Sequence, residues 1–170
     1  VSLFGVETTE ASRKTLTRLR RRIGVVYQDF RLLDHLSAYE NAALPLRVTG
    51  RHEREYRDDV MELLQWVGLG DRVQAKPTTL SGGEQQRVAI ARAIASDPAV
   101  VLADEPTGNL DAENGAKMMD MLDQLTRRSG KTLVMVTHSQ EIVSRADRVL
   151  RMRSGRVVEN DSPGTGGLPS

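Results

Sequence analysis

Apolar side chains follow two different spacings along the chain. Runs of consecutive apolar residues occupy positions 23–28 (IGVVYQ), 99–104 (AVVLAD) and 131–138 (KTLVMVTH). Short β-branched runs of this kind predict strands. The run at 99–104 is typical of a strand buried on both faces of a parallel sheet.

Helical spacing separates these runs. Between residues 52 and 67, apolar residues recur at i, i+3, i+4 and i+7, namely Val60, Leu63, Leu64 and Val67. This predicts an amphipathic helix that Gly68 and Gly70 end. Ser37 can cap another helix that runs through residue 46, where Pro45 would disturb it. Further helices are predicted over residues 81–96, 112–129 and 139–146.

The alternation of strands and helices predicts an α/β layer fold. One domain is expected over residues 1–159, with a helical insert at about 33–96 and a closing pair of strands about Ser154 and Gly155. The tail at 160–170 is rich in Gly, Pro and Ser, which predicts disorder.

Charge and composition narrow the function classes. The 170 residues carry 24 Lys and Arg against 23 Asp and Glu, a balance that gives no reason to expect a nucleic-acid partner. The absence of cysteine excludes disulfide and thiol chemistry. No apolar run approaches the ~20 residues that cross a bilayer, and no secretory signal opens the chain, so a cytoplasmic location is expected.

The most informative stretch is LSGGEQQR at residues 80–87. Ser81 and Glu84 form the pattern of a capping box, and Gly82 and Gly83 leave the first helical turn without side chains. Open backbone amides at the positive end of a helix dipole suit a phosphate. An ordinary capped helix is the alternative. Two glycines there weaken a helix by roughly 1 kcal/mol each relative to alanine, which argues that they serve a ligand.

Polar residues lie at the ends of the predicted strands, where ligands bind in parallel α/β sheets. Asp104 suits Mg²⁺ coordination through water, and Glu105 suits a general base that orients and deprotonates an attacking water. His138 can hydrogen-bond a terminal phosphate, and the Gln28 amide can bind a metal or the attacking water. Each residue alone also fits a structural role; their order along the chain favours a site.

A phosphate loop of the pattern G-x-x-x-x-G-K-[ST] is not found in the 170 residues. The nearest match, SGKT at 129–132, lacks the first glycine, because that position is Leu125. Lys131 is therefore expected in an ordinary turn between a helix and a strand. The chain also begins at Val1 rather than at Met, and its first residues, VSLFG, start in the middle of a pattern. We therefore expect a fragment whose first strand, phosphate loop and following helix lie before Val1.

Together these motifs resemble the nucleotide-binding domain of ABC ATPases, a P-loop NTPase-like fold. The resemblance rests on Gln28, the signature LSGGEQQR, the Walker B strand VVLADE, the loop GNLD at 108–111 and His138. DEPTGNLD is similar to the branch of lipoprotein-release, macrolide-export and cell-division ATPases. Residues 27–51 (YQDFRLLDHLSAYENAALPLRVTGR) are most similar to the FtsE subfamily of cell-division ATPases.

The resemblance implies ATP and Mg²⁺ as cofactors. It assigns Mg²⁺ binding to Asp104 and Gln28, the general base to Glu105 and a γ-phosphate contact to His138.

The resemblance also implies partners. Two copies would dimerise head to tail, with Ser81, Gly82 and Gly83 facing a nucleotide held by the partner copy, and Asp111 lying across the interface. The membrane partner implied is FtsX, at the cytoplasmic face of the inner membrane. Residues 29–50 are its expected docking surface, with exposed apolar side chains at Phe30, Leu32, Leu33 and Tyr39.

The sequence therefore leaves three hypotheses for the function. The leading hypothesis is an FtsE-like ATPase subunit, inactive as the fragment given. The second is a transport ATPase for lipoproteins or macrolides. The third is a non-enzymatic shortened chain that donates its signature helix to a complete partner; intact Glu105 and His138 weigh against it.

Overall fold

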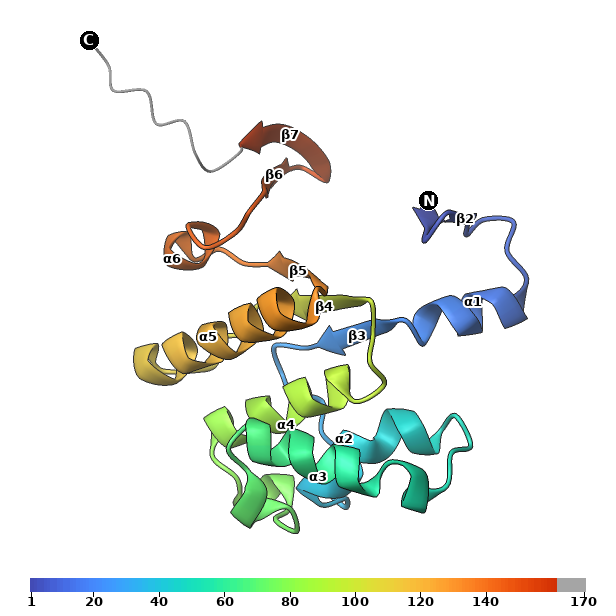
Figure 1. Ribbon diagram of the computed structural model, residues 1–170. Helices are drawn as coiled ribbons and strands as arrows, with labels where there is room; N and C mark the ends of the chain where they lie inside the picture. The colour runs from blue at the N-terminus through green and yellow to red at the C-terminus, as the bar shows by residue number, and fades with distance from the viewer. Residues whose placement is uncertain (162–170) are drawn as a thin grey trace. The chain divides into compact units, whose positions relative to one another are not determined.

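A computed structural model describes residues 1–161 (Figure 1). The chain divides into two compact units, Val1–Val136 and Thr137–Ser170. The first unit contains β1 (Ser2–Leu3), β2 (Val6–Glu7), α1 (Arg13–Arg20), β3 (Ile23–Val26), α2 (Ala38–Arg47), η1 (Glu53–Glu55), α3 (Arg57–Trp66), η2 (Gly70–Arg72), η3 (Pro77–Thr79), α4 (Gly82–Ile94), β4 (Val100–Asp104), α5 (Ala112–Ser129) and β5 (Thr132–Val136). The second contains α6 (Gln140–Val143), β6 (Val149–Arg153) and β7 (Arg156–Asp161).

A three-stranded parallel sheet, in the order β3-β4-β5, organises the first unit. Val26 of β3 pairs with Ala103 of β4, and Asp104 of β4 pairs with Val136 of β5. The three predicted strands are confirmed, although β3 ends at Val26, two residues before Gln28. Because parallel strands end at the same edge, the residues directly after β3 and β4 meet there.

One face of this sheet is covered by helices. In Figure 1, α4 and α5 run along the same side of the strands. The contact between β3 and α4 is so close that a Cβ on Gly24 would collide with the carbonyl of Ala93. Val26, Val101 and Ala103 are buried on this face. Gly24 is therefore required by a close approach of backbones rather than by a turn.

The opposite face of the sheet is exposed. Leu102, Val134 and Val136 are 37%, 49% and 60% exposed. The prediction that the strand at 99–104 is buried on both faces is therefore wrong for residues 1–161, since alternate side chains of β4 face solvent.

A second group of buried side chains joins α2, α3 and α4. It includes Ala42, Leu46, Val60, Leu64 and Val88. The apolar spacing predicted between residues 52 and 67 is confirmed, with the α-helix itself beginning at Arg57. Pro45 lies inside α2 and does not end it, since the helix continues to Arg47. Its missing N–H removes one bond of the helix, which the surrounding packing outweighs.

The sequence patterns did not predict the antiparallel pair β1 and β2 at the start of the chain. The hairpin of the second unit was predicted and is confirmed: β6 and β7 are antiparallel around Ser154 and Gly155, with φ of 50° and 74°. Such positive φ values at both central residues suit a tight hairpin turn. Residues 160 and 161 belong to β7, and the rest of the predicted disordered tail, 162–170, lies outside the described residues.

Candidate functional site

The first turn of α4 presents open backbone amides. Ser81 Oγ accepts from Glu84 N at 3.3 Å, and Glu84 Oε2 accepts from Ser81 N at 2.8 Å. This confirms the predicted capping box. Within residues 1–161, the amides of Gly82 and Gly83 donate to no acceptor. Both therefore remain available to an anion at the positive end of a 13-residue helix.

The two signature glycines also have close neighbours in the same chain. A Cβ at Gly82 would lie 4.0 Å from Phe30 Cζ and 3.9 Å from Asn109 O. A Cβ at Gly83 would lie only 3.2 Å from Asn114 Oδ1. Gly83 is therefore also required by its approach to α5, a reason that the sequence did not reveal.

A small cleft opens beside Gly83. It has a volume of about 220 Å³, and its lining includes Trp66, Arg87, Asn114 and Lys117. Arg87 Nε, within the described part of the chain, has no hydrogen-bond partner. Gly83 and two cationic side chains, Arg87 and Lys117, thus line the same cleft, and Lys117 Nζ also pairs with Glu113 Oε1 at 2.6 Å.

Glu105 comes directly after β4 in a strained conformation, with φ of 44°. Its N–H donates to Val136 O at 2.9 Å, and its carbonyl accepts from Gly108 N at 3.0 Å. A left-handed backbone at a non-glycine residue costs about 1–3 kcal/mol and clusters at functional sites. Asp104, the last residue of β4, exposes its side chain at the same edge of the sheet.

Gln28 lies against this turn. A Cβ on Gly108 would be 3.1 Å from Gln28 Nε2. Asn109 Nδ2 donates to Gln28 O at 2.7 Å. The structure therefore brings Gln28 to the turn that begins at Glu105, as expected from residues at the ends of neighbouring parallel strands.

Two further side chains tie helices to this turn. Gln86 of α4 is fully buried, and its Nε2 donates to Pro106 O at 2.8 Å. Asp111 caps α5: its Oδ1 accepts from Asn114 N at 2.9 Å, and its Oδ2 accepts from Asn114 Nδ2 at 2.7 Å. The backbone hydrogen bond from Asn114 lowers the pKa of Asp111 below its ordinary value. Asp111 thus has a role within its own chain, and its expected role across an interface stays a prediction.

His138 lies two residues beyond β5 and belongs to the second unit. There, Ser139 N donates to Thr137 Oγ1 at 3.1 Å. The predicted contact of His138 with a γ-phosphate stays a prediction. Lys131 behaves as predicted: it comes after Gly130, a left-handed residue that ends α5, and its Nζ pairs with Asp97 Oδ1 at 2.5 Å.

ATP and Mg²⁺ fit the donor groups at two places, the start of α4 and the edge of the sheet. The open amides of Gly82 and Gly83 suit phosphate oxygens, and Asp104 and Gln28 offer the hard oxygen ligands that Mg²⁺ prefers. Among residues 1–161, no three side chains of His, Cys, Asp or Glu are grouped to hold a metal. Such a donor set suits an ion held mainly by phosphate oxygens and water, with one or two protein ligands.

Comparison with known proteins identifies the family. A family model described as ABC transporter matches residues 2–108, which include Gln28, the signature glycines and Glu105. This chain belongs to the ABC transporter family. The predicted α/β fold is likewise confirmed. The chain matches a dimeric structure of the ATP-binding cassette MJ0796 bound to ADP and Pi with a TM-score of 0.84. The match has 38% identity and covers 95% of this chain and 72% of that one.

Relatives of similar identity carry different names. The chain is 46% identical to an uncharacterized ABC transporter ATP-binding protein of Mycobacterium tuberculosis, over 93% of this chain and 64% of that protein. It is 44% identical to the cell division ATP-binding protein FtsE of Streptococcus pneumoniae, over 96% of this chain and 71% of that protein. It is 45% identical to the lipoprotein-releasing system ATP-binding protein LolD of Syntrophus aciditrophicus, over 91% and 70%. The chain thus spans 64% of the length of the first of these relatives.

The expected docking surface is less exposed than the sequence suggested. Of its four apolar side chains, Leu33 is 39% exposed, whereas Phe30, Leu32 and Tyr39 are half-buried. Tyr39 OH donates to Glu53 Oε1 at 3.1 Å. Partial burial and this contact raise the pKa of Tyr39 to about 12. None of the helices in the described part of the chain has the length and apolar content to span a bilayer.

Sequence reasoning missed several residues of the site. Asn109 was seen only as part of the loop GNLD, with no contact assigned to it, and Asn114 was overlooked because an amide side chain in the first turn of a helix carries no pattern of its own. Arg92 was overlooked as well, although it is the only charged residue in the segment VAIARAI at 88–94. A lone charge within an apolar helical segment is a usable signal, because such a charge needs a specific partner.

Proposed function

We propose that this chain acts in an ATP-hydrolysing subunit of an ABC-type membrane complex of the FtsE kind, which works with FtsX in cell division. ATP and Mg²⁺ are its cofactors. Glu105 is the general base, Asp104 and Gln28 are the Mg²⁺ ligands, and His138 contacts the γ-phosphate. The subunit pairs with a second copy at the cytoplasmic face of the inner membrane.

The strained turn at Glu105 is the observation that carries this proposal. The backbone of Glu105, left-handed at the end of β4, is held there by its surroundings and not by its own preference. Gln28 lies against the same turn through Gly108 and Asn109. An acid and an amide at one sheet edge suit the task of orienting a water for attack on a phosphate.

The open amides of Gly82 and Gly83 support the head-to-tail pairing. They lie in the first turn of α4 and donate to no acceptor in residues 1–161. In the proposed dimer, Ser81 and these amides close over the phosphates of a nucleotide bound by the other copy, and Asp111 meets that copy.

Turnover of ATP tests the proposal in two proteins. The 170-residue chain should show no ATPase activity above background, because its sequence has no phosphate loop to position and neutralise the phosphates. The protein expressed from the complete gene should hydrolyse ATP, and Glu105→Gln should lower its turnover by about a hundredfold or more. An ATP-bound dimer should then accumulate and elute earlier in size-exclusion chromatography.

Two results would contradict the proposal. Turnover by the 170-residue chain that disappears in Glu105→Gln would mean that the residues present suffice. Full turnover of Glu105→Gln in the complete protein would remove Glu105 from the chemistry.

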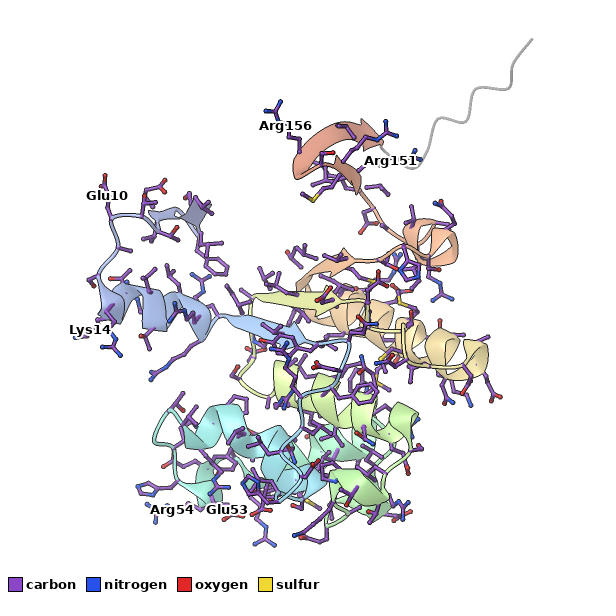
Figure 2. All side chains as sticks on the ribbon, turned by 180° about the vertical axis from the view of Figure 1, so that it is seen from behind. Glu10, Lys14, Glu53, Arg54, Arg151 and Arg156 are labelled. Carbon is purple, nitrogen blue, oxygen red and sulfur yellow. The ribbon has the colours of Figure 1, made fainter. Side chains whose placement is uncertain are left out.

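Co-purification with FtsX tests the partner. Leu33 and Val48 are the exposed apolar residues of segment 29–50, at 39% and 72% exposed. Leu33→Asp and Val48→Asp should abolish co-purification with FtsX, because a charge disrupts an apolar contact. Arg54→Glu is the control; Arg54 lies at the outer edge of the helical cluster (Figure 2). Unchanged binding of both Asp variants would move the interface elsewhere.

A transport ATPase for lipoproteins or macrolides is the second candidate. The 45% identity to LolD favours it as strongly as the 44% identity to FtsE favours cell division. Co-purification with the membrane subunits of a lipoprotein-releasing system instead of FtsX would decide for it.

A further inference from the structure

Arg92 of α4 binds the chain just after Gln28. Its Nη1 donates to Arg31 O at 2.5 Å, and its Nη2 donates to Phe30 O at 2.6 Å. The planar guanidinium thus holds two successive carbonyls with one fork of donors. These bonds connect residues that are 61 and 62 positions apart in the sequence.

The backbone that Arg92 holds is strained. Phe30 and Arg31 have φ of 59° and 48°, so two consecutive non-glycine residues lie in the left-handed region. Residues in this region persist only where the surrounding structure fixes them. The Arg31 side chain adds local contacts: it stacks over the Tyr27 ring at 4.3 Å and pairs with Asp29 at 3.1 Å. These contacts lie within the segment itself, whereas the bonds from Arg92 tie the two carbonyls to a helix.

The Arg92 guanidinium would also be destabilised if this arrangement were disturbed. The guanidinium is half-buried, and it has no ion pair within residues 1–161. Its charge is therefore compensated by carbonyl dipoles. Burial lowers the pKa of Arg92 below its ordinary value. If the segment changed conformation, a poorly hydrated cation would lose its partners.

The turn that begins at Glu105 holds the other end of the same segment. Asn109 Nδ2 donates to Gln28 O at 2.7 Å, and Gly108 lies against the Gln28 amide. The Phe30 ring approaches the first turn of α4, where its Cζ would be 4.0 Å from a Cβ on Gly82. Residues 28–31 therefore bridge the signature helix and the turn that begins at Glu105.

We propose that Arg92 is a positioning residue that sets the place of the Gln28 amide through the two carbonyls it binds. This proposal rests on the ATPase function proposed above. Arg92 touches neither nucleotide nor metal; it acts through the carbonyls of Phe30 and Arg31.

A double-mutant cycle between Arg92 and Gln28 tests the proposal in the protein expressed from the complete gene. Arg92→Lys keeps the charge but cannot donate to both carbonyls in a fixed fork. We expect turnover of ATP to fall about tenfold, with the KM for ATP changed less than about twofold, because ATP is bound elsewhere. The Mg²⁺ concentration for half-maximal activity should rise. In a Gln28→Ala background, Arg92→Lys should cause no further loss, since Arg92 would act only through Gln28.

Arg31→Gly provides a rescue. Glycine adopts left-handed φ without strain, and the carbonyl that Arg92 binds is retained. In the Arg92→Lys protein, Arg31→Gly should restore part of the lost turnover. If Arg92→Lys does not fold, Arg92→Gln, which keeps one donor and removes the half-buried charge, serves in the same cycle.

The outcomes separate this proposal from the proposed function. An unaltered turnover in Arg92→Lys, or losses that multiply with those of Gln28→Ala, would overturn the positioning role while ATPase activity stands. No ATPase activity in the wild-type protein, or full activity in Glu105→Gln, would overturn the proposed function itself.

Discussion

Two helices of this chain begin with the same cap and differ in their first two residues. α2 is capped by Ser37 and Glu40, and α4 by Ser81 and Glu84, with Glu Oε2 to Ser N distances of 2.8 Å in both. Behind the cap, α2 continues with Ala38 and Tyr39, whereas α4 continues with Gly82 and Gly83.

The first two backbone amides of these helices accordingly differ in their hydrogen bonds. In α2, Ala38 N donates to Ala75 O at 2.8 Å, and Tyr39 N donates to Val73 O at 2.9 Å. In α4, the equivalent amides of Gly82 and Gly83 meet no acceptor in residues 1–161. The capping box therefore indicates only that a helix begins. Whether its start is structural or available to a ligand depends on the neighbours of the next two amides.

The largest expected effect comes from charging the open helix start. Gly82→Asp should lower ATP turnover of the complete protein on the order of a hundredfold and prevent ATP-dependent dimerisation, because two like charges in a poorly hydrated interface repel. Gly82 suits this test better than Gly83, where a side chain would also meet Asn114 at 3.2 Å. ATPase assays and size-exclusion chromatography with ATP and Mg²⁺ measure both effects. Normal ATP-dependent dimerisation of Gly82→Asp would mean that α4 closes no site.

Removing the cap hydroxyl should have different effects on protein stability and on ATP turnover in the two helices. Ser37→Ala should lower the free energy of unfolding by about 1–2 kcal/mol, since Ser37 is only 5% exposed. Ser81→Ala should cost about 1 kcal/mol or less, because its cap is exposed, but should reduce ATP turnover, which Ser37→Ala leaves intact. Urea unfolding and an ATPase assay on both variants give the comparison. Equal activities would contradict the distinction between the two helix starts.

A smaller effect is expected from giving α4 the first residue of α2. Gly82→Ala should raise the free energy of unfolding by up to about 1 kcal/mol, because alanine favours helix and the nearest atoms are 3.9 Å or more away. ATP turnover should fall at the same time. Thermal unfolding measures the gain in stability, and a parallel ATPase assay measures the loss of turnover. A variant that is both more stable and fully active would show that the glycine at position 82 serves no ligand.

The smallest effect concerns the cap carboxylates. Hydrogen bonds from the backbone of Ser37 and Ser81 lower the pKa of Glu40 and Glu84, respectively, below their ordinary values. A carboxylate with a lowered folded-state pKa contributes stability that is present above its unfolded pKa and is lost as the pH falls through its folded pKa. Stability should therefore decrease on acidification below the ordinary range of a Glu carboxyl. Glu40→Gln and Glu84→Gln should each flatten the acid side of a plot of unfolding midpoint against pH; an unchanged slope would contradict the assignment.

Sequence patterns predicted the elements that depend on local spacing. The helix at 112–129 was placed at its observed limits, and the cap at Ser81 was predicted with its Glu84 partner. The equivalent box at Ser37 was seen only in part, and Pro45 wrongly suggested a disturbance. Pro45 is tolerated because the buried residues of α2, including Ala42 and Leu46, fix the helix from outside its own hydrogen bonds.

The parts of the site that could not be predicted depend on contacts between distant segments. The bonds from Arg92 to Phe30 and Arg31 and the approach of Asn114 to Gly83 join residues with no common local pattern. The strained backbone of Glu105 is likewise tied to a distant segment, through the bond from its N–H to Val136 O on the neighbouring strand. Spacing thus predicts which residues reach the edge of the sheet, whereas packing decides how they are held there.

The exposed face of the sheet has a consequence for how these 170 residues behave in a test tube. Leu102, Val134 and Val136 form an apolar surface on two adjacent strands, and β5 is the outermost of these strands in residues 1–161. Such a surface attracts the same surface on other molecules, and an unpaired strand edge offers them hydrogen bonds. On slow heating, solutions of the isolated chain should therefore turn turbid at a temperature that falls as the protein concentration rises, before circular dichroism records the loss of its helices.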